Sequence, residues 1–383
     1  MKLNVRIIWI MLIVLLLGIL LARIYVAPPA ALVQLLQQTQ SAQSNRGTQH
    51  DVSSPSITLK PTPPPLRPNL VAGIIFPQWG PRSYTTADKN WEPGLKKIHT
   101  QTGANWISLY LQLHQDSEFT TNVHIARDGQ TPAGLKAGVE MAHKMGYRVY
   151  VFPAITLDNT HAWGGYIKYA TGTDNQVWFN NYWRQIQPFL QACQQAKCDR
   201  FSIGNEYEGL EQSPDIYWHQ LLTRVHTVYS GQIVYSRNFS SQLKYPISPW
   251  MKDPLLSEIG LSSYYSLIDT ETKVTKQQLP GLWKSRVQSH LDEMARMLGK
   301  PVFISEIGYR DTIYAGYLPY QDTDDGVKDL DMQAALFDAA FQNIANDKLI
   351  DGVFIWAWSK PPFAPNYTPA AKVIHHWYDR FLR

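Results

Sequence analysis

Cysteine is scarce in this sequence: Cys193 and Cys198 are the only two among 383 residues. No histidine stands at ligand spacing from them, so a structural zinc site is not expected. The net charge is only +4, and no Lys/Arg-rich block follows the amino-terminal segment, which argues against a nucleic-acid partner. No internal repeat of solenoid period is visible. The acidic stretch 322–326 does not match the spacing of an EF-hand, so the sequence predicts neither a metal nor a cofactor.

The composition is that of a globular enzyme rather than a tail or a scaffold. The chain is 44% apolar and 17% charged, so it can bury a large core, and its length suits one large domain with an appendage. Aromatic residues make up 12% of the chain, including 13 Trp and 21 Tyr. These two residue types offer flat amphipathic surfaces that suit sugar rings, although core packing uses the same side chains.

The amino-terminal segment has the features of a membrane anchor. Lys2 and Arg6 precede the uncharged run Ile7–Ala22, which predicts a transmembrane signal anchor over residues 1–26 with its amino terminus in the cytoplasm. A cleavable signal peptide is the alternative, but the only candidate cleavage site, Val26-Ala27, is followed by two prolines. In both cases the rest of the chain is expected outside the cytoplasm. If the segment is an anchor, the protein lies at the cell surface or in the periplasm, and if the segment is cleaved, the protein is secreted.

A linker and a single folded unit follow the anchor. Residues 27–68 are rich in Gln, Ser, Thr and Pro, and such a segment buries too little apolar surface to fold. The folded unit is predicted over residues 69–383. Outside the cytoplasm, Cys193 and Cys198 could close a small disulfide within it, and two free thiols are the alternative.

The folded unit alternates strand-like and helix-like segments. Gly103, Gly146 and Gly299 fall where helices should stop, as left-handed cap residues do. No glycine-rich dinucleotide or phosphate loop follows the first strand, which argues against a doubly wound open sheet. Eight alternations predict an α/β fold of the (β/α)8 TIM-barrel type. The predicted strands are Val71–Pro77, Asn105–Leu111, Arg148–Pro153, Arg200–Glu206, Ile233–Ser236, Glu258–Tyr265, Pro301–Glu306 and Gly352–Trp358.

Two glutamates stand where the fourth and seventh predicted strands run out. Glu206 and Glu306 would therefore lie at the carboxyl ends of barrel strands, the face on which barrel enzymes carry their chemistry. Two carboxyls across a barrel mouth can cleave a glycosidic bond if one is held protonated and the other ionised. The alternative is a purely structural role, in which backbone amides or the side chains of Arg237 and Arg310 form hydrogen bonds or ion pairs with the two carboxylates.

Polar neighbours are predicted to complete this site. Asn205 could hold a sugar hydroxyl, and Tyr264 or Tyr265, at the end of the sixth strand, could donate a hydrogen bond to Glu306.

The two strand ends resemble a known family. Gly204-Asn205-Glu206 and Ser305-Glu306-Ile307-Gly308-Tyr309 resemble the retaining glycoside hydrolases of clan A, and the chain most resembles glycoside hydrolase family 113, the barrel β-mannanases. The resemblance covers nearly all of residues 69–383. It implies that Glu206 is the acid/base, Glu306 the nucleophile and Asn205 the ligand of the 2-hydroxyl, with a β-linked polysaccharide as substrate.

One departure affects the substrate. The third strand in these enzymes commonly ends in a Lys-Pro-His-type stretch, whereas Val151–Asp158 here keeps only the proline and a later acid. A site without those polar groups cannot hold a hydroxyl in the same way, so mannan is a provisional substrate.

Tryptophans at strand ends are candidates for contact with sugar. Trp356 and Trp358 share one face of the eighth strand by its two-residue period and could form a floor under the reactive sugar. Trp79 and Trp163 follow the first and third strands. Filling of the barrel core is the alternative for all four.

The sequence thus predicts a membrane-anchored, extracytoplasmic glycoside hydrolase that binds a polysaccharide or oligosaccharide and acts by double displacement. Two alternatives stay open. One is a barrel without catalysis that binds envelope polysaccharide. The other is a transglycosylase, which uses the same residues but passes the sugar to a hydroxyl group rather than to water.

Overall fold

The computed structural model describes residues 65–323 and 326–383. The predicted anchor and most of the predicted linker lie outside these residues and stay predictions. Within the described part, no helix is both long and apolar enough to cross a membrane. The folded unit includes residues ahead of Asn69, because the Arg67 guanidinium donates to the carbonyls of Ile344, Asp347 and Ile350 at 2.6–2.8 Å.

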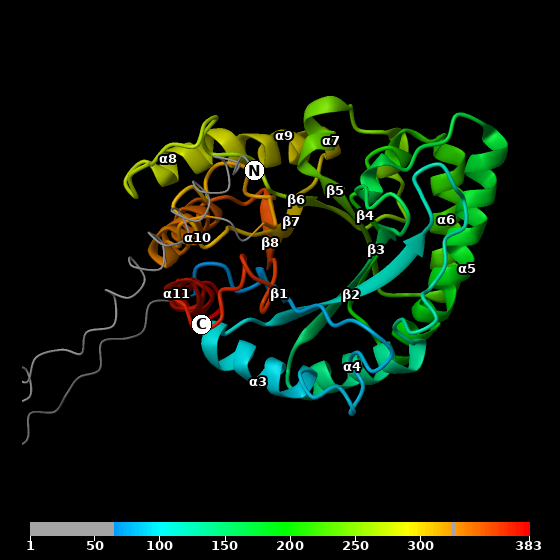
Figure 1. Ribbon diagram of the computed structural model, residues 1–383, viewed down its shortest axis with the longest axis horizontal. Coiled ribbons are helices and arrows are strands. Elements are labelled where there is room, and N and C mark those ends of the chain that lie inside the picture. Colours follow the sequence, from blue (N-terminus) through cyan, green and yellow to red (C-terminus); the bar gives the residue numbers. More distant parts are fainter. Residues whose placement is uncertain (1–64, 324–325) are drawn as a thin grey trace, which may run out of the picture. The chain divides into compact units, whose positions relative to one another are not determined.

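Eight parallel strands form a closed barrel in chain order, which confirms the predicted architecture (Figure 1). Each strand pairs with its neighbours in sequence, and β1 closes the ring by pairing with β8 through Gly73 and Phe354. The strands are β1 (Val71–Ile75), β2 (Trp106–Gln115), β3 (Arg148–Leu157), β4 (Arg200–Asn205), β5 (Gln232–Asn238), β6 (Glu258–Ser262), β7 (Val302–Ile307) and β8 (Ile350–Ile355). β2 and β3 run four residues further than predicted and stay paired to their ends.

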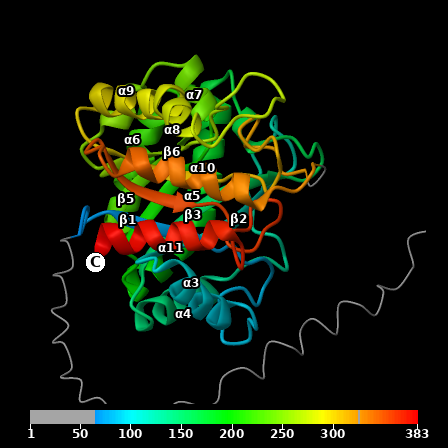
Figure 2. The same cartoon turned by 90° about the vertical axis from the view of Figure 1, so that its left-hand side faces the viewer.

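Helices surround the barrel, and Figure 2 shows α10 and α11 side by side on its outer face. The predicted left-handed caps are confirmed at Gly103, Gly146 and Gly299, with φ of 65°, 87° and 72°. The helices are α3 (Trp91–Thr102), α4 (Pro132–Lys144), α5 (Gly172–Ala196), α6 (Asp215–Val228), α7 (Phe239–Lys244), α8 (Leu279–Trp283), α9 (Ser289–Leu298), α10 (Leu330–Ile344) and α11 (Pro369–Leu382).

Two helical regions differ from the prediction. The apolar pattern before Gly299 predicts a helix over residues 282–298, whereas the observed helical region begins at Leu279 and contains a π-helical segment, Lys284–Gln288, between α8 and α9. The short helix α7 after β5 was not predicted, because six residues are too few to show a helical period.

Aromatic side chains fill the barrel interior. The inner cluster includes Trp106, Tyr150, Phe152, Phe303 and Phe354. The ring of Phe152 stacks on Tyr150 at 5.6 Å between centroids, and the other rings pack edge to face or tilted at 5.0–6.2 Å. Glycine provides the room that these rings need: a Cβ on Gly73 would lie 2.2 Å from the Phe354 ring. The interior is therefore a packed core.

Candidate active site

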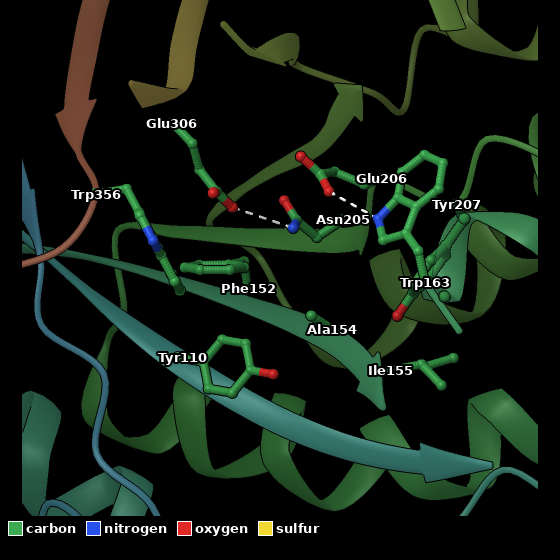
Figure 3. A pocket seen from close by; sticks show the side chains of 12 residues that line it. Tyr110, Phe152, Ala154, Ile155, Trp163, Asn205, Glu206, Tyr207, Glu306 and Trp356 are labelled. Carbon is green, nitrogen blue, oxygen red and sulfur yellow. Dashed lines mark hydrogen bonds between the residues drawn. The ribbon is translucent and has the colours of Figure 1, made fainter. Parts of the chain in front are cut away.

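Glu206 and Glu306 come together at the carboxyl end of the barrel, where their side chains border one cavity (Figure 3). β4 ends at Asn205, so Glu206 is the first residue past the strand, and its N–H donates to the Ser236 carbonyl at 2.8 Å. Glu206 has a left-handed backbone with φ of 58°, which costs a residue with a side chain roughly 1–2 kcal/mol. Strain of this kind is typical of functional positions.

Two side chains hold the carboxyl group of Glu306. The amide of Asn205 donates to Oε1 and the hydroxyl of Tyr264 donates to Oε2, both at 3.1 Å. Glu306 is only 7% exposed, so these donors replace most of its contact with water. Both bonds favour the ionised form of the carboxyl group. The structure therefore gives Asn205 a second task besides the 2-hydroxyl contact that the resemblance implies.

Glu206 accepts a hydrogen bond from a different kind of donor. The indole Nε1 of Trp163 donates to its Oε2 at 3.1 Å. Trp163 can take this position because Gly165 has no side chain: a Cβ there would lie 2.3 Å from the indole ring. The indole fixes the direction of Glu206 and adds an apolar wall beside it.

The two carboxyls titrate as a coupled pair. Burial, followed by the nearby charge of Glu206, raises the pKa of Glu306 to about 8, while the bonds from Tyr264 and Asn205 lower it. Burial also raises the pKa of Glu206, whereas the hydroxyl of Ser262 and then the indole of Trp163 lower it. The pair keeps one proton near neutral pH, as a mechanism with one acid and one carboxylate requires.

The cavity between the two carboxyls measures about 190 Å³, and five of its twelve lining residues are aromatic (Figure 3). Trp356 borders it, as predicted for the floor. The prediction missed Ala154 and Ile155 because β3 continues beyond its predicted end at Pro153. It also missed Tyr110 and Phe152, which lie within the predicted strands. The lining residues are Tyr110, Phe152, Ala154, Ile155, Trp163, Gly164, Gly165, Asn205, Glu206, Tyr207, Glu306 and Trp356.

Three predicted contacts lie outside this cavity. Tyr265 donates its hydroxyl to Gln242 and stacks on His290 at 4.8 Å, since consecutive residues at a strand end point to opposite sides. Trp358 is 2% exposed and belongs to the core, because β8 ends at Ile355 and the two-residue period does not continue to it. Trp79 is 53% exposed and lies 6.4 Å from the ring of Tyr110, so it borders the mouth rather than the cavity.

The contacts of Arg237 and Arg310 do not support the alternative in which these two arginines bind the glutamates in a purely structural role. Arg237 is fully buried and pairs instead with Glu211, Nε to Oε2 at 2.8 Å. A guanidinium nitrogen of Arg310 donates to the Tyr317 carbonyl at 3.4 Å.

The end of the third strand is less polar than the resemblance would imply. Ala154 faces the cavity, and the acid at its far end, Asp158, accepts a hydrogen bond from His114, Nδ1 to Oδ1 at 2.7 Å. The sugar-binding contacts on this side therefore differ in kind from a Lys-Pro-His stretch.

Cys193 and Cys198 form a disulfide between the end of α5 and the segment before β4. Among residues 65–323 and 326–383, no group of three or more His, Cys, Asp or Glu side chains could hold a metal ion.

A closed (β/α)8 barrel with two carboxyls facing one cavity at its carboxyl end is the arrangement found in glycoside hydrolases. The chain belongs to Glycoside Hydrolase Family 113, whose model matches residues 78–378, and it is a glycoside hydrolase. This confirms the family resemblance seen in the sequence.

Solved structures with the same fold include two from this family. A β-mannanase of family 113 from Alicyclobacillus acidocaldarius, in complex with ManMIm, has a TM-score of 0.70 and 18% identity over 83% of this chain and 100% of its own. A family 113 β-1,4-mannanase complex has a TM-score of 0.68 and 19% identity over 81% of this chain and 99% of its own. A β-glucuronidase from Ruminococcus gnavus has a TM-score of 0.55 and 13% identity over 82% of this chain and 50% of its own. No curated protein matches the chain.

The bond between Trp163 and Glu206 leads to a prediction about pH. In a Trp163→Phe variant, Glu206 loses a donor that stabilises its charged form, so its pKa rises. We expect the alkaline limb of the profile of kcat/KM against pH to move to higher pH. Trp377→Phe is a matched control, because that indole also donates to a carboxylate, Asp338 at 2.7 Å, but on the outer helices. An unmoved limb in the first variant, or equal shifts in both, would contradict the role of Trp163.

Proposed function

We propose that this hydrolase acts with retention of configuration, with Glu206 as acid/base and Glu306 as nucleophile. The proposal rests on the different hydrogen-bond donors of the two carboxyls that border the cavity. Glu306 accepts hydrogen bonds from Asn205 and Tyr264, whereas Glu206 accepts one from the indole of Trp163. The bonds from Asn205 and Tyr264 favour the ionised form of Glu306, although burial and the charge of Glu206 raise its pKa to about 8. The proposed mechanism requires the shared proton to be on Glu206 when the substrate is bound.

In the first step, Glu206 gives its proton to the glycosidic oxygen while Glu306 attacks the anomeric carbon. The bond between that carbon and the oxygen breaks, and the leaving chain departs with the proton. In the second step, Glu206 removes a proton from water, whose oxygen attacks the anomeric carbon and releases Glu306. Each step inverts the anomeric centre, so the product keeps the β configuration.

We propose a β-linked polysaccharide of the mannan type as substrate. Membership of family 113 and the titles of the β-mannanase structures support this choice. The aromatic lining, with Trp356 and Phe152 on the cavity, suits the apolar faces of a hexose.

The test is the stereochemistry of the first product. We expect soluble β-mannan or glucomannan to be cleaved, and proton NMR of the fresh reaction to show the β anomer before mutarotation yields the α anomer. Appearance of the α anomer first would overturn the double displacement. Cleavage of other β-glycans but not of mannans would be compatible with the proposed mechanism but would contradict mannan as the substrate.

The same experiment separates hydrolysis from the two alternatives. Products longer than the substrate, detected by mass, would indicate transfer to a sugar hydroxyl. Binding of glycans without any new reducing ends would indicate a barrel that only binds.

A further inference from the structure

A groove lies on the outer side of the barrel between helices α3 and α11, which are neighbours in the structure (Figure 2). Its volume is about 550 Å³, within the usual range of ligand clefts, about 300–1,000 Å³. One wall comes from Thr100 and Gln101 at the end of α3, and the other comes from Tyr367 and the first two turns of α11. The groove shares no lining residue with the cavity between the two glutamates, so it is a separate feature of the surface.

Tyr367 presents an aromatic ring in this groove. The residue is 70% exposed, although an aromatic side chain gains free energy from burial. Its backbone has a left-handed φ of 59°, which is strained for a residue with a bulky side chain. Gln101 stabilises this conformation, because its Oε1 accepts a hydrogen bond from the Tyr367 N–H at 3.0 Å. Strain that the surroundings maintain is typical of positions that bind ligands.

Polar side chains lie around the exposed ring. The ammonium group of Lys97, on the last turns of α3, lies 5.6 Å from the centre of the Tyr367 ring. On α11, Lys372 is exposed and His375 is half-buried. No Asp or Glu is among the described residues that line the groove. The groove therefore combines an aromatic surface with hydrogen-bond donors, and it suits a ligand rich in acceptor oxygens rather than a cation.

We propose that this groove is a second binding site for a polysaccharide chain, separate from the site of cleavage. The inference rests on the proposed function, because an enzyme that acts on a polymer meets chains long enough to contact its surface away from the cavity. A hexose can lay its apolar face on the ring of Tyr367 while Lys372 and His375 bind its hydroxyl oxygens. A chain held in the groove raises the effective concentration of polymer at the cavity, as linked binding events do.

The first test measures binding by affinity electrophoresis in soluble glucomannan. All proteins compared carry Glu306→Gln and Trp356→Ala, so that they do not cleave the polymer and the cavity binds it weakly. We expect clear retardation in this background, and about tenfold weaker binding when Tyr367→Ala is added. Ile216→Ala is the matched control, because it removes another exposed apolar side chain, on α6. No retardation of the background protein, or equal retardation with Tyr367→Ala and with Ile216→Ala, would overturn the second site.

The left-handed backbone of Tyr367 provides a variant that separates binding from folding. Tyr367→Gly removes the ring and also relieves the strain, because glycine adopts a positive φ readily. Its melting temperature should therefore exceed that of Tyr367→Ala, whereas both variants should lose the same share of glucomannan binding. Tyr367→Phe keeps the aromatic face and should bind nearly as well as the parent protein. Binding by Tyr367→Gly as tight as that by Tyr367→Phe would show that the ring does not contact the polymer, and the proposal would fail.

Rates separate this site from the chemistry in the cavity. In the otherwise unchanged enzyme, Tyr367→Ala should lower kcat/KM on long glucomannan about threefold, because the groove no longer holds the polymer. The rate on β-1,4-mannopentaose should not change, since the groove and the cavity share no lining residue. Equal losses on the two substrates would overturn the second site.

Failure of the proposed function has a different outcome. If the enzyme without substitutions cleaves no mannan, that function fails by itself. Electrophoresis of the background protein in a panel of other soluble β-glycans then decides the groove. A glycan whose binding Tyr367→Ala weakens and Ile216→Ala leaves unchanged supports the second site, and retardation by none of them overturns it.

Discussion

Glu306→Ala is expected to reduce turnover by about 10⁴-fold or more, the largest loss of any single substitution in the site. Without this carboxylate no covalent intermediate can form, and the donors Asn205 and Tyr264 then face an empty position. Initial rates on an activated aryl β-mannoside, where protonation matters least, measure the loss of the nucleophile most directly. Binding of soluble glucomannan should persist, because the aromatic lining stays in place.

A small anion gives this prediction a second readout. Azide can enter the space left by the Glu306 side chain and attack the anomeric carbon directly, so the expected product is the α-glycosyl azide, formed by a single inversion. Glu258→Gln controls for the removal of a buried carboxyl, since Glu258 pairs with Arg200 at 2.8 Å at the opposite end of the barrel. That variant should lose stability but keep its turnover per folded molecule. Substantial activity of Glu306→Ala without azide would show that Glu306 is not the nucleophile.

The position of the two glutamates at one face of the barrel could be predicted from the sequence because it follows from strand order alone. Parallel strands in a barrel all end at the same face, so a glutamate at the end of the fourth strand and one at the end of the seventh must meet there. The same reasoning named Tyr264 or Tyr265 as a donor to Glu306, and in the structure the donor is Tyr264. These predictions needed only the period and the ends of buried strands.

The aromatic contacts could not be predicted in the same way, because they depend on where each strand stops. Trp358 was extrapolated from a two-residue period that ends at Ile355, and it is buried in the core instead. The hydrogen bond from Trp163 to Glu206 depends on the loop after β3, where Gly165 leaves room for the indole. A periodic sequence pattern cannot predict the conformation of such a loop. Ala154 and Ile155 were missed because β3 extends past its apolar run.

The surroundings of the two glutamates also show why sequence could suggest their roles only through a resemblance. As residues they are the same, and both follow an apolar run. Their difference arises from donors brought in by other strands: Tyr264 follows β6, and Trp163 follows β3. Such pairings over long sequence distances become visible only when the barrel is closed.

Glu206→Ala is expected to have an effect that depends on the leaving group. On mannan, whose leaving alcohol needs a proton, we expect kcat/KM to fall by about 10²–10⁴-fold, the usual contribution of a general acid. On an aryl mannoside with an acidic phenol, the first step needs little protonation, so kcat/KM should fall far less. The alkaline limb of the pH profile should also disappear, because the group that loses the proton is gone. Steady-state rates over a series of phenols of increasing pKa measure this dependence.

The two variants must differ in the configuration of their azide products if the roles are correctly assigned. In Glu206→Ala the nucleophile Glu306 still forms the glycosyl intermediate, and azide then attacks it from the opposite face in place of activated water. Two inversions give the β-glycosyl azide, whereas Glu306→Ala gives the α anomer by one. The opposite assignment, with the α azide from Glu206→Ala, would exchange the roles of the two glutamates. The hydrogen bonds from Asn205 and Tyr264 to Glu306 favour the first outcome, since they stabilise the carboxylate that has to attack.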